Sequence, residues 1–167
     1  MKLIFLGTGT STGIPTIGID KPVCSSPDPK DVRMRSSALL QIGDKNILID
    51  CSPDFRQQML KSKVSKIDAI LFTHEHSDHT AGLDDVRPIS FKHGKIPIFA
   101  HKRVLSNLER RFDYLFDKKG YYTGAPHVFS NIINEESNFN IEDLEFKTIS
   151  YMLSLIHISE PTRHERI

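Results

Sequence analysis

The sequence predicts a fold of the α/β class, in which short buried strands alternate with helices. Two observations support this prediction. Short apolar runs rich in β-branched residues recur between turn signals, and several of them are followed by segments with helical spacing of apolar residues. The chain has 167 residues, of which 38% are hydrophobic, which suffices for one domain with a sizeable core.

The strands are expected to lie within apolar runs bounded by glycine, proline or polar turns. They cover residues 2–6, 37–42, 46–50, 69–72 and 96–100, followed by a hairpin at 139–141 and 144–150. A Gly-Thr-Gly-Thr turn follows the first strand, but the spacing of Gly7, Gly9 and Gly13 does not match a dinucleotide-binding motif. We therefore expect a tight turn that needs glycine dihedral angles.

Helices are expected at residues 53–61, 82–86 and 102–116. Ser52 should cap the first helix, with Pro53 at its first position, and Pro88 should end the second. The third helix carries apolar residues at helical spacing, which predicts a face that packs in a core or an interface. These residues are Val104, Leu105, Leu108, Phe112, Leu115 and Phe116.

Two segments have no clear periodicity. Residues 11–35 contain four prolines and should form a long ordered loop. Residues 118–126 are rich in turn formers. His93, His101 and His127 have no ligand partner at short spacing and are expected to be surface or loop histidines.

The most informative stretch is residues 73–79, which reads T-H-E-H-S-D-H directly after the strand expected at 69–72. On an extended backbone, His74 and His76 point the same way and can reach one cation. Asp78 and His79 lie past the turn and suit a second cation. Imidazole and carboxylate ligands suit zinc or manganese. The alternative is a polar surface loop that happens to be rich in histidine.

Two such metals about 3.5–4 Å apart can share a bridging hydroxide and promote phosphoryl displacement. In this interpretation Asp78 is also catalytic, because it binds a metal and orients the attacking water. The sequence therefore predicts a hydrolase that uses two divalent metal ions, zinc or manganese.

The H-E-H-S-D-H motif resembles the H-x-H-x-D-H signature of the metallo-β-lactamase-fold hydrolases. Residues 5–11, 36–40, 47–58 and 82–87 resemble one branch of them. That branch contains the phosphoribosyl cyclic phosphate phosphodiesterases and, more distantly, tRNase Z. The resemblance implies the N-terminal part of a four-layer αββα sandwich over residues 1–152, a phosphodiesterase acting on a small diester, and a possible homodimer.

The resemblance also suggests roles for residues outside the motif. Asp50 matches an acidic residue that supports the metal loop without binding metal, and it would accept a hydrogen bond from a ligand histidine. The alternative for Asp50 is a helix cap. Arg87 can either reach a substrate phosphate or form an ion pair with a neighbouring aspartate. Relatives often bind a structural zinc through cysteines in the 11–35 segment, but only Cys24 is present here, so that site is not expected.

Three other functions are considered beside the phosphodiesterase. A ribonuclease of the tRNase Z type would need an RNA-binding insertion, and none is recognisable before residue 152. A thioester or lactone hydrolase would use the same metal motif. The third is a non-enzymatic fragment, which we expect for the chain of 167 residues itself.

This last expectation comes from the end of the chain. Residues 153–163 read L-S-L-I-H-I-S-E-P-T-R, which resembles the translation of a transposase-based sequencing adapter. We expect residues 153–167 to be a non-native tail on an incomplete domain, 1–152. The remaining metal ligands implied by the resemblance would then be missing, and His157 in the tail is not counted as one. The exposed sheet should also make the chain prone to aggregation.

Composition limits the partners. The net charge is +1, so no overall field attracts nucleic acid or a membrane surface. A small phosphodiester is the expected substrate, and nucleic acid is not indicated. No apolar stretch is long enough to span a bilayer. Cys24 and Cys51 do not indicate a disulfide framework, which fits a cytoplasmic protein.

Overall fold

The computed structural model describes residues 1–117 and 127–150. It divides into two compact units, of which the first is Met1–Asn134 and the second begins at Glu135. The turn-rich segment 118–126 and the tail 153–167, with His157, lie outside the described residues.

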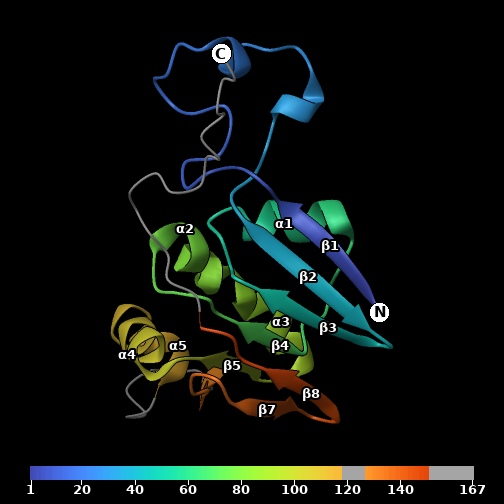
Figure 1. The fold of residues 1–167 in the computed structure, drawn as a ribbon, viewed down its shortest axis with the longest axis vertical. Helices are drawn as coiled ribbons and strands as arrows, with labels where there is room; N and C mark the ends of the chain where they lie inside the picture. The colour runs from blue at the N-terminus through green and yellow to red at the C-terminus, as the bar shows by residue number, and fades with distance from the viewer. Residues whose placement is uncertain (118–126, 151–167) are drawn as a thin grey trace, which may run out of the picture. The chain divides into compact units, whose positions relative to one another are not determined.

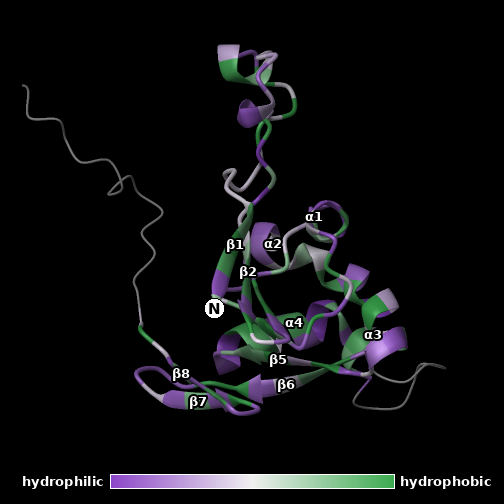
Figure 2. Ribbon diagram, turned by 90° about the vertical axis from the view of Figure 1, so that its right-hand side faces the viewer, coloured by the Kyte–Doolittle hydropathy of each residue, from purple (hydrophilic) through white to green (hydrophobic). Residues whose placement is uncertain are grey.

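The first unit is built on a six-stranded sheet whose strand order follows the chain, β1 to β6 (β1 to β5 are labelled in Figure 1, and β6 in Figure 2). The strands β1, β2 and β3 are paired antiparallel, whereas β3 to β6 are parallel. Their bounds are Lys2–Gly7, Ser37–Ile42, Lys45–Ile49, Ala69–Leu71, Ile96–Ala100 and Val128–Ile132. The predicted α/β class is confirmed.

Strand β6 was not predicted from the sequence. Its polar residues Ser130 and Asn131 hide the apolar pattern of a strand. Strand β6 forms by parallel pairing with β5, and Ser130 within it donates a hydrogen bond to the carboxylate of Glu109, 2.6 Å away. The strand is therefore specified by contacts with distant residues rather than by its own sequence.

The helices differ from the predictions in their boundaries. They are α1 (Phe55–Ser62), α2 (Ser77–Thr80), α3 (Arg87–His93), α4 (Lys102–Arg111) and α5 (Asp113–Phe116), with 3-10 turns η1 (Pro22–Cys24), η2 (Pro29–Asp31) and η3 (Ala81–Val86). None of the helices in the described part of the chain is long and apolar enough to cross a bilayer.

The predicted start of the first helix was wrong. The helix begins at Phe55, because Ser52 forms a turn before it. The Ser52 hydroxyl accepts from the amide of Asp54 and donates to Gln58, each at 3.2 Å. Asp54 occupies the N-cap position, but its carboxylate accepts from the backbone amide and guanidinium of Arg35 instead.

Two further helix predictions were partly wrong. The helix expected at 82–86 is present as the 3-10 turn η3, but Pro88, which was expected to end it, lies in the first turn of α3, where the missing amide hydrogen and fixed φ angle are tolerated. The segment 102–116 was expected to be one helix, but it breaks at Phe112, whose φ and ψ are −126° and 39°. The apolar face predicted along it is nevertheless buried in the core.

The main core lies between the sheet and its helices, which cover one face of the sheet (Figures 1 and 2). On that face the register places Leu39 beside Leu48 and Leu48 beside Ile70. Phe55 of α1 and Leu108 of α4 belong to the same buried cluster. This packing fixes α1 and α4 against the strands that lead to the histidine motif.

The opposite face of the sheet is also apolar. The register places Leu3 beside Leu40, and Ile49 beside Leu71. The side chains of Leu3 and Phe5 are 50% and 69% exposed, and a hydrophobic stretch of β1 is visible in Figure 2. The first unit therefore presents an apolar surface near its N-terminal strand.

The loop between β1 and β2 contains η1 and η2, as expected for an ordered segment rather than a linker. Isolated bridges pair Gly9 with Arg35 and Ile14 with Arg33 at its base. Gly7 is needed here for space, because a Cβ atom on it would lie 2.0 Å from the carbonyl oxygen of Arg35. The expected glycine dihedral angle is present at Gly13, whose φ is 70°, but not at Gly7 or Gly9, whose φ angles are not positive. Cys24 in this loop and Cys51 are free thiols.

The described part of the second unit contains the hairpin of β7 (Asn138–Ile141) and β8 (Leu144–Lys147). The strands are antiparallel, with Phe139 paired with Phe146. Their rings stack at a centroid distance of 5.5 Å. The hairpin predicted for this region is confirmed, although its second strand ends earlier than expected.

Candidate metal centre

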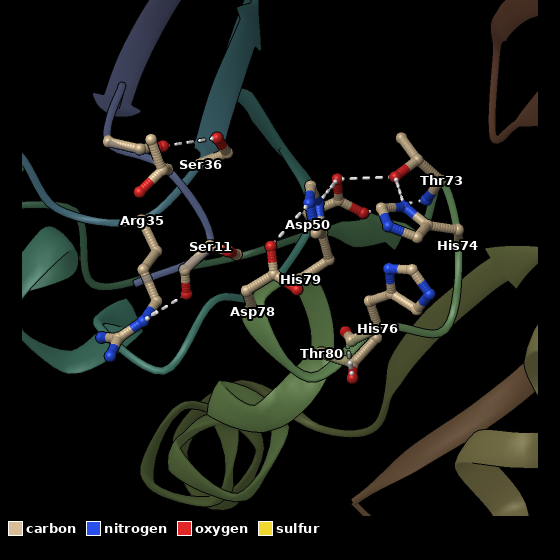
Figure 3. A network of polar contacts seen from close by, with 12 residues as sticks. Ser11, Arg35, Ser36, Asp50, Thr73, His74, His76, Asp78, His79 and Thr80 are labelled. Carbon is tan, nitrogen blue, oxygen red and sulfur yellow. Dashed lines mark hydrogen bonds and ion pairs between the residues drawn. The ribbon is translucent and has the colours of Figure 1, made fainter. Parts of the chain in front are cut away.

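Two parallel strands bring the predicted site residues together. Ile49 at the end of β3 is in register with Leu71 at the end of β4. The carboxyl ends of parallel strands meet at one edge of a sheet. The chain therefore places Asp50 beside the start of the T-H-E-H-S-D-H segment (Figure 3).

Asp50 occupies a left-handed conformation with φ of 58°, and it is 5% exposed. Its Oδ1 accepts from the Thr73 amide, and its Oδ2 accepts from the Thr73 hydroxyl, both at 2.8 Å. Oδ2 also lies 2.7 Å from Nδ1 of His79. The carboxylate thus connects both ends of the histidine segment, and it does not cap a helix.

His79 lies on the short helix α2 and faces Asp50 with one ring nitrogen. Because Asp50 accepts a hydrogen bond from this ring, the pKa of His79 is raised, although partial burial opposes the effect. Its other nitrogen, Nε2, lies 3.3 Å from Oδ2 of Asp78. The hydrogen bond at Nδ1 therefore orients the ring of His79 so that its Nε2 atom lies beside the Asp78 carboxylate.

His74 and His76 lie beside this pair. The ring centroid of His74 is 4.1 Å from that of His79 and 4.7 Å from that of His76. Nδ1 of His74 lies 3.0 Å from the Thr73 hydroxyl. Partial burial and the neighbouring His79 lower the pKa of His74, which favours the neutral imidazole that metals require.

The donor set fits divalent metal ions chemically. Three imidazoles and a carboxylate gather at one sheet edge, and an outer carboxylate orients one imidazole. However, within residues 1–117 and 127–150, no three or more histidine, cysteine, aspartate or glutamate side chains are grouped in a geometry that could hold a metal ion. The assignments of His74, His76, Asp78 and His79 as ligands therefore stay predictions.

Sequence reasoning missed two residues near the motif. Thr73 was not singled out, although a hydroxyl next to a predicted ligand is a local signal that could have been noticed. Arg111 contacts the back of the segment from α4. Nothing in the local sequence indicates this contact, because the two segments are more than 30 positions apart.

Arg87 forms an ion pair with Asp84, whose Oδ2 lies 2.6 Å from the guanidinium Nη2. This was one of the two alternatives for Arg87. Asp84 also accepts a hydrogen bond from the Tyr114 hydroxyl at 2.8 Å. Burial, followed by this hydrogen bond, raises the pKa of Tyr114 to about 12.

The remaining histidines occupy surface or loop positions as expected, but His127, in the loop before β6, is buried. His93 and His101 are exposed. Backbone hydrogen bonds join His127 to Leu115 and Ile96, and the Nδ1 atom of its ring lies 2.5 Å from the hydroxyl of Ser90. A buried histidine of this kind cannot be recognised from local spacing.

A hollow of about 290 Å³ adjoins the site. Its lining includes Asp50, together with Phe5, Thr8 and Ser36 from the β1 and β2 region. The hollow is therefore lined both by apolar side chains and by hydroxyl groups.

Known proteins share this architecture. The crystal structure of a diphosphatase from the PhnP family is 40% identical in sequence, with a TM-score of 0.77 over 87% of this chain and 54% of that chain. The structure of Zn²⁺-bound PqqB from Methylobacterium extorquens has a TM-score of 0.71 over 90% of this chain and 56% of that one. Its identity of 24% supports the fold alone.

Two relatives match most of the chain by sequence. An octanoyltransferase of Porphyromonas gingivalis is 43% identical over 154 residues, which cover 91% of this chain and 31% of that protein. A ribonuclease Z of Geobacillus kaustophilus is 27% identical over 148 residues, or 84% of this chain and 43% of that protein. The chain thus spans less than half of each of these relatives and about half of the solved structures.

The sequence model of the β-lactamase superfamily domain matches residues 45–163. That range includes Asp50 and the whole histidine motif. It also includes the parallel strands that position them. The chain therefore belongs to the β-lactamase superfamily and has the metallo-β-lactamase fold.

Proposed function

We propose that the protein is a divalent-metal-dependent phosphoric ester hydrolase that acts on a small phosphodiester. The observation that carries this proposal is the arrangement of Asp50, His79 and Asp78. Asp50 contacts Nδ1 of His79 at 2.7 Å, and Nε2 of the same ring lies 3.3 Å from the Asp78 carboxylate. A histidine oriented in this way by a carboxylate is typical of a metal ligand.

His74 and His76 would hold one metal ion, and Asp78 and His79 would hold the other. When bound, zinc or manganese would supply Lewis acidity toward phosphoryl oxygens and would acidify water. Asp50 would keep a proton on Nδ1 of His79, leaving Nε2 as the electron-pair donor. The Asp78 side chain is 20% exposed, so it is accessible to water and would orient it toward the substrate.

The relatives support phosphoryl chemistry. The 40% identical structure is a diphosphatase, and ribonuclease Z is named for cleavage of RNA. The octanoyltransferase matches over only 31% of its length, so that activity is not carried over. Since the chain spans part of each relative, the activity is proposed for the whole protein that contains this segment.

Ribonuclease activity of the tRNase Z type is the second candidate, supported by the 27% identical ribonuclease Z. The net charge of +1 favours the small substrate, because RNA binding usually relies on clustered positive charge. We also propose a cytoplasmic location, which the free Cys24 and Cys51 support. Dimer formation remains a proposal from the family resemblance.

The test is a hydrolysis assay of the purified whole protein that contains this segment, with Zn²⁺ or Mn²⁺, on four substrates, and the chain of 167 residues is assayed beside it. These are bis(p-nitrophenyl) phosphate, a nucleoside diphosphate ester, a precursor tRNA and an acyl thioester. We expect cleavage of the first two and its loss on chelation or in His76→Ala. Faster cleavage of the tRNA would favour the ribonuclease, whereas cleavage of the thioester alone would contradict phosphoryl chemistry. No activity on any substrate would favour the non-enzymatic fragment.

A further inference from the structure

The T-H-E-H-S-D-H segment has two sides. The side with His74, His76, Asp78 and His79 carries the predicted metal donors. Glu75 and Ser77, which alternate with these donors, and Thr80, which follows them, make contacts to a single guanidinium on the other side. That guanidinium belongs to Arg111, the last residue of α4.

The contacts of Arg111 cover the whole turn. Its Nη1 donates to the carbonyl oxygen of Glu75 at 3.1 Å and to the hydroxyl of Thr80 at 2.9 Å. Its Nη2 donates to the hydroxyl of Ser77 at 3.3 Å. The Glu75 carbonyl lies in the backbone between His74 and His76. The guanidinium therefore contacts the chain before and after His76, Asp78 and His79.

Thr80 extends this contact to the backbone of a predicted ligand. Its side chain is fully buried, and its hydroxyl donates to the carbonyl oxygen of His76 at 2.9 Å. Arg111, Thr80 and His76 thus form a continuous chain of hydrogen bonds. In Figure 3, the Thr80 side chain points away from the imidazole rings.

The guanidinium itself is held in place. It lies over the ring of Phe112, with its carbon 5.2 Å from the ring centroid, and Asn107 accepts a further hydrogen bond from it at 3.5 Å. Leu108 in the preceding turn is fully buried in the core. Helix α4 is therefore anchored in the core, and its Arg103 also pairs with the Glu75 carboxylate at 3.3 Å.

We propose that Arg111 is a positioning residue that holds the turn of residues 75–80 in its metal-binding conformation. This inference rests on the proposed function, because it takes His76, Asp78 and His79 within that turn to be metal ligands. Arginine suits the role because its planar fork presents several donors at fixed angles. A lysine at this position would keep the charge but would satisfy fewer of the acceptors.

The test compares Arg111→Met and Arg111→Lys with Arg110→Met, which removes the same charge from an exposed neighbouring position. Zn²⁺ affinity is measured by competition with a chromogenic chelator, at a temperature where circular dichroism shows each variant to be folded. The visible spectrum of bound Co²⁺ is recorded in parallel, because it reports ligand geometry. Amide hydrogen exchange of the metal-free proteins compares residues 75–80 with the central strands.

We expect Arg111→Met to weaken Zn²⁺ binding at least about tenfold, as is usual when an outer partner of a ligand is removed. It should also alter the Co²⁺ spectrum and speed exchange in residues 75–80 but not in β3. Arg111→Lys should restore part of the affinity. Arg110→Met should match the unmodified chain in all three measurements.

The inference is overturned if Arg111→Met binds Zn²⁺ within about twofold of the unmodified chain with the same Co²⁺ spectrum. It is likewise overturned if exchange rises equally in residues 75–80 and in β3, since that pattern indicates a general loss of stability. Failure of the proposed function gives a different result. In that case the unmodified chain itself binds no Zn²⁺.

Discussion

Oδ2 of Asp50 lies 2.7 Å from Nδ1 of His79, although the two residues are 29 positions apart in the sequence. The same carboxylate accepts hydrogen bonds from the amide and the hydroxyl of Thr73 at 2.8 Å. One buried acidic residue at the end of β3 therefore fixes both ends of the histidine motif. The consequences of this arrangement can be measured directly.

Asp50→Asn should weaken Zn²⁺ binding by about 10- to 100-fold, because the amide accepts more weakly from Nδ1 of His79. Asparagine tolerates the left-handed backbone that Asp50 adopts, so the substitution tests the carboxylate rather than backbone strain. Chelator competition measures the affinity. Asp44→Asn, at an exposed hairpin position, is the control, and equal affinities for the two variants would refute the orienting role.

Leu108→Ala should lower the free energy of unfolding by about 2–5 kcal/mol, since it leaves a cavity among fully buried side chains. Leu60→Ala is the matched control, because Leu60 lies on helix α1 but is 61% exposed. Its expected cost is below about 0.5 kcal/mol. Urea denaturation measures both, and similar losses would contradict the packing of α4 described above.

The buried His127 should make the protein less stable in mild acid. Burial lowers its pKa from 6.5, so in the folded state it binds a proton less readily than in the unfolded chain. As the pH falls through 6.5, the unfolded chain gains the proton first, and the free energy of unfolding declines until the folded pKa is passed.

Urea denaturation at pH 5.5 and 7.5 tests this expectation by comparison with His127→Gln. The variant should lose less stability between the two pH values. His74 and His79 are present in both proteins, so their contributions cancel. The groups that face the ring are Ser90 and Phe91 of α3, with Arg87 and Asp84 acting at longer range. An unchanged pH dependence in the variant would show that His127 is not responsible.

The apolar face near β1 should bind hydrophobic dyes. Phe5 is 69% exposed and lies on the same face of the sheet as Leu3 and Leu40. Phe5→Thr should therefore lower the fluorescence of an added naphthalene sulfonate dye and slow aggregation. Ile17→Thr should change neither, although Ile17 is 97% exposed, because it lies in the loop between β1 and β2. Equal effects of the two substitutions would contradict a continuous apolar surface.

Much of this architecture could be predicted from the sequence, because the determining patterns are local. The apolar run before Thr73 marks a strand, and the spacing of His74, His76 and His79 marks a candidate metal loop. The helical spacing of Val104, Leu105 and Leu108 marks a core face. In each case the residues that carry the signal are close together in the chain.

The remaining features depend on contacts between distant residues. Ser52 closes a turn with Gln58 instead of capping a helix. Strand β6 forms through pairing with β5, and His127 is buried by Ser90 and Phe91. Arg111 reaches Glu75 across 36 positions. No local pattern encodes these contacts, so sequence reasoning missed them.

The central claim is that His74, His76, Asp78 and His79 bind divalent metal. The most direct measurement is equilibrium dialysis against Zn²⁺, followed by metal analysis, of the unmodified chain, His74→Ala, His79→Ala and His93→Ala. His93 is exposed on α3 and serves as the control. The account predicts saturable Zn²⁺ binding that is lost in the first two variants and retained in the third. Zn²⁺ binding that is absent from the unmodified chain, or unchanged in His74→Ala and His79→Ala, would contradict it.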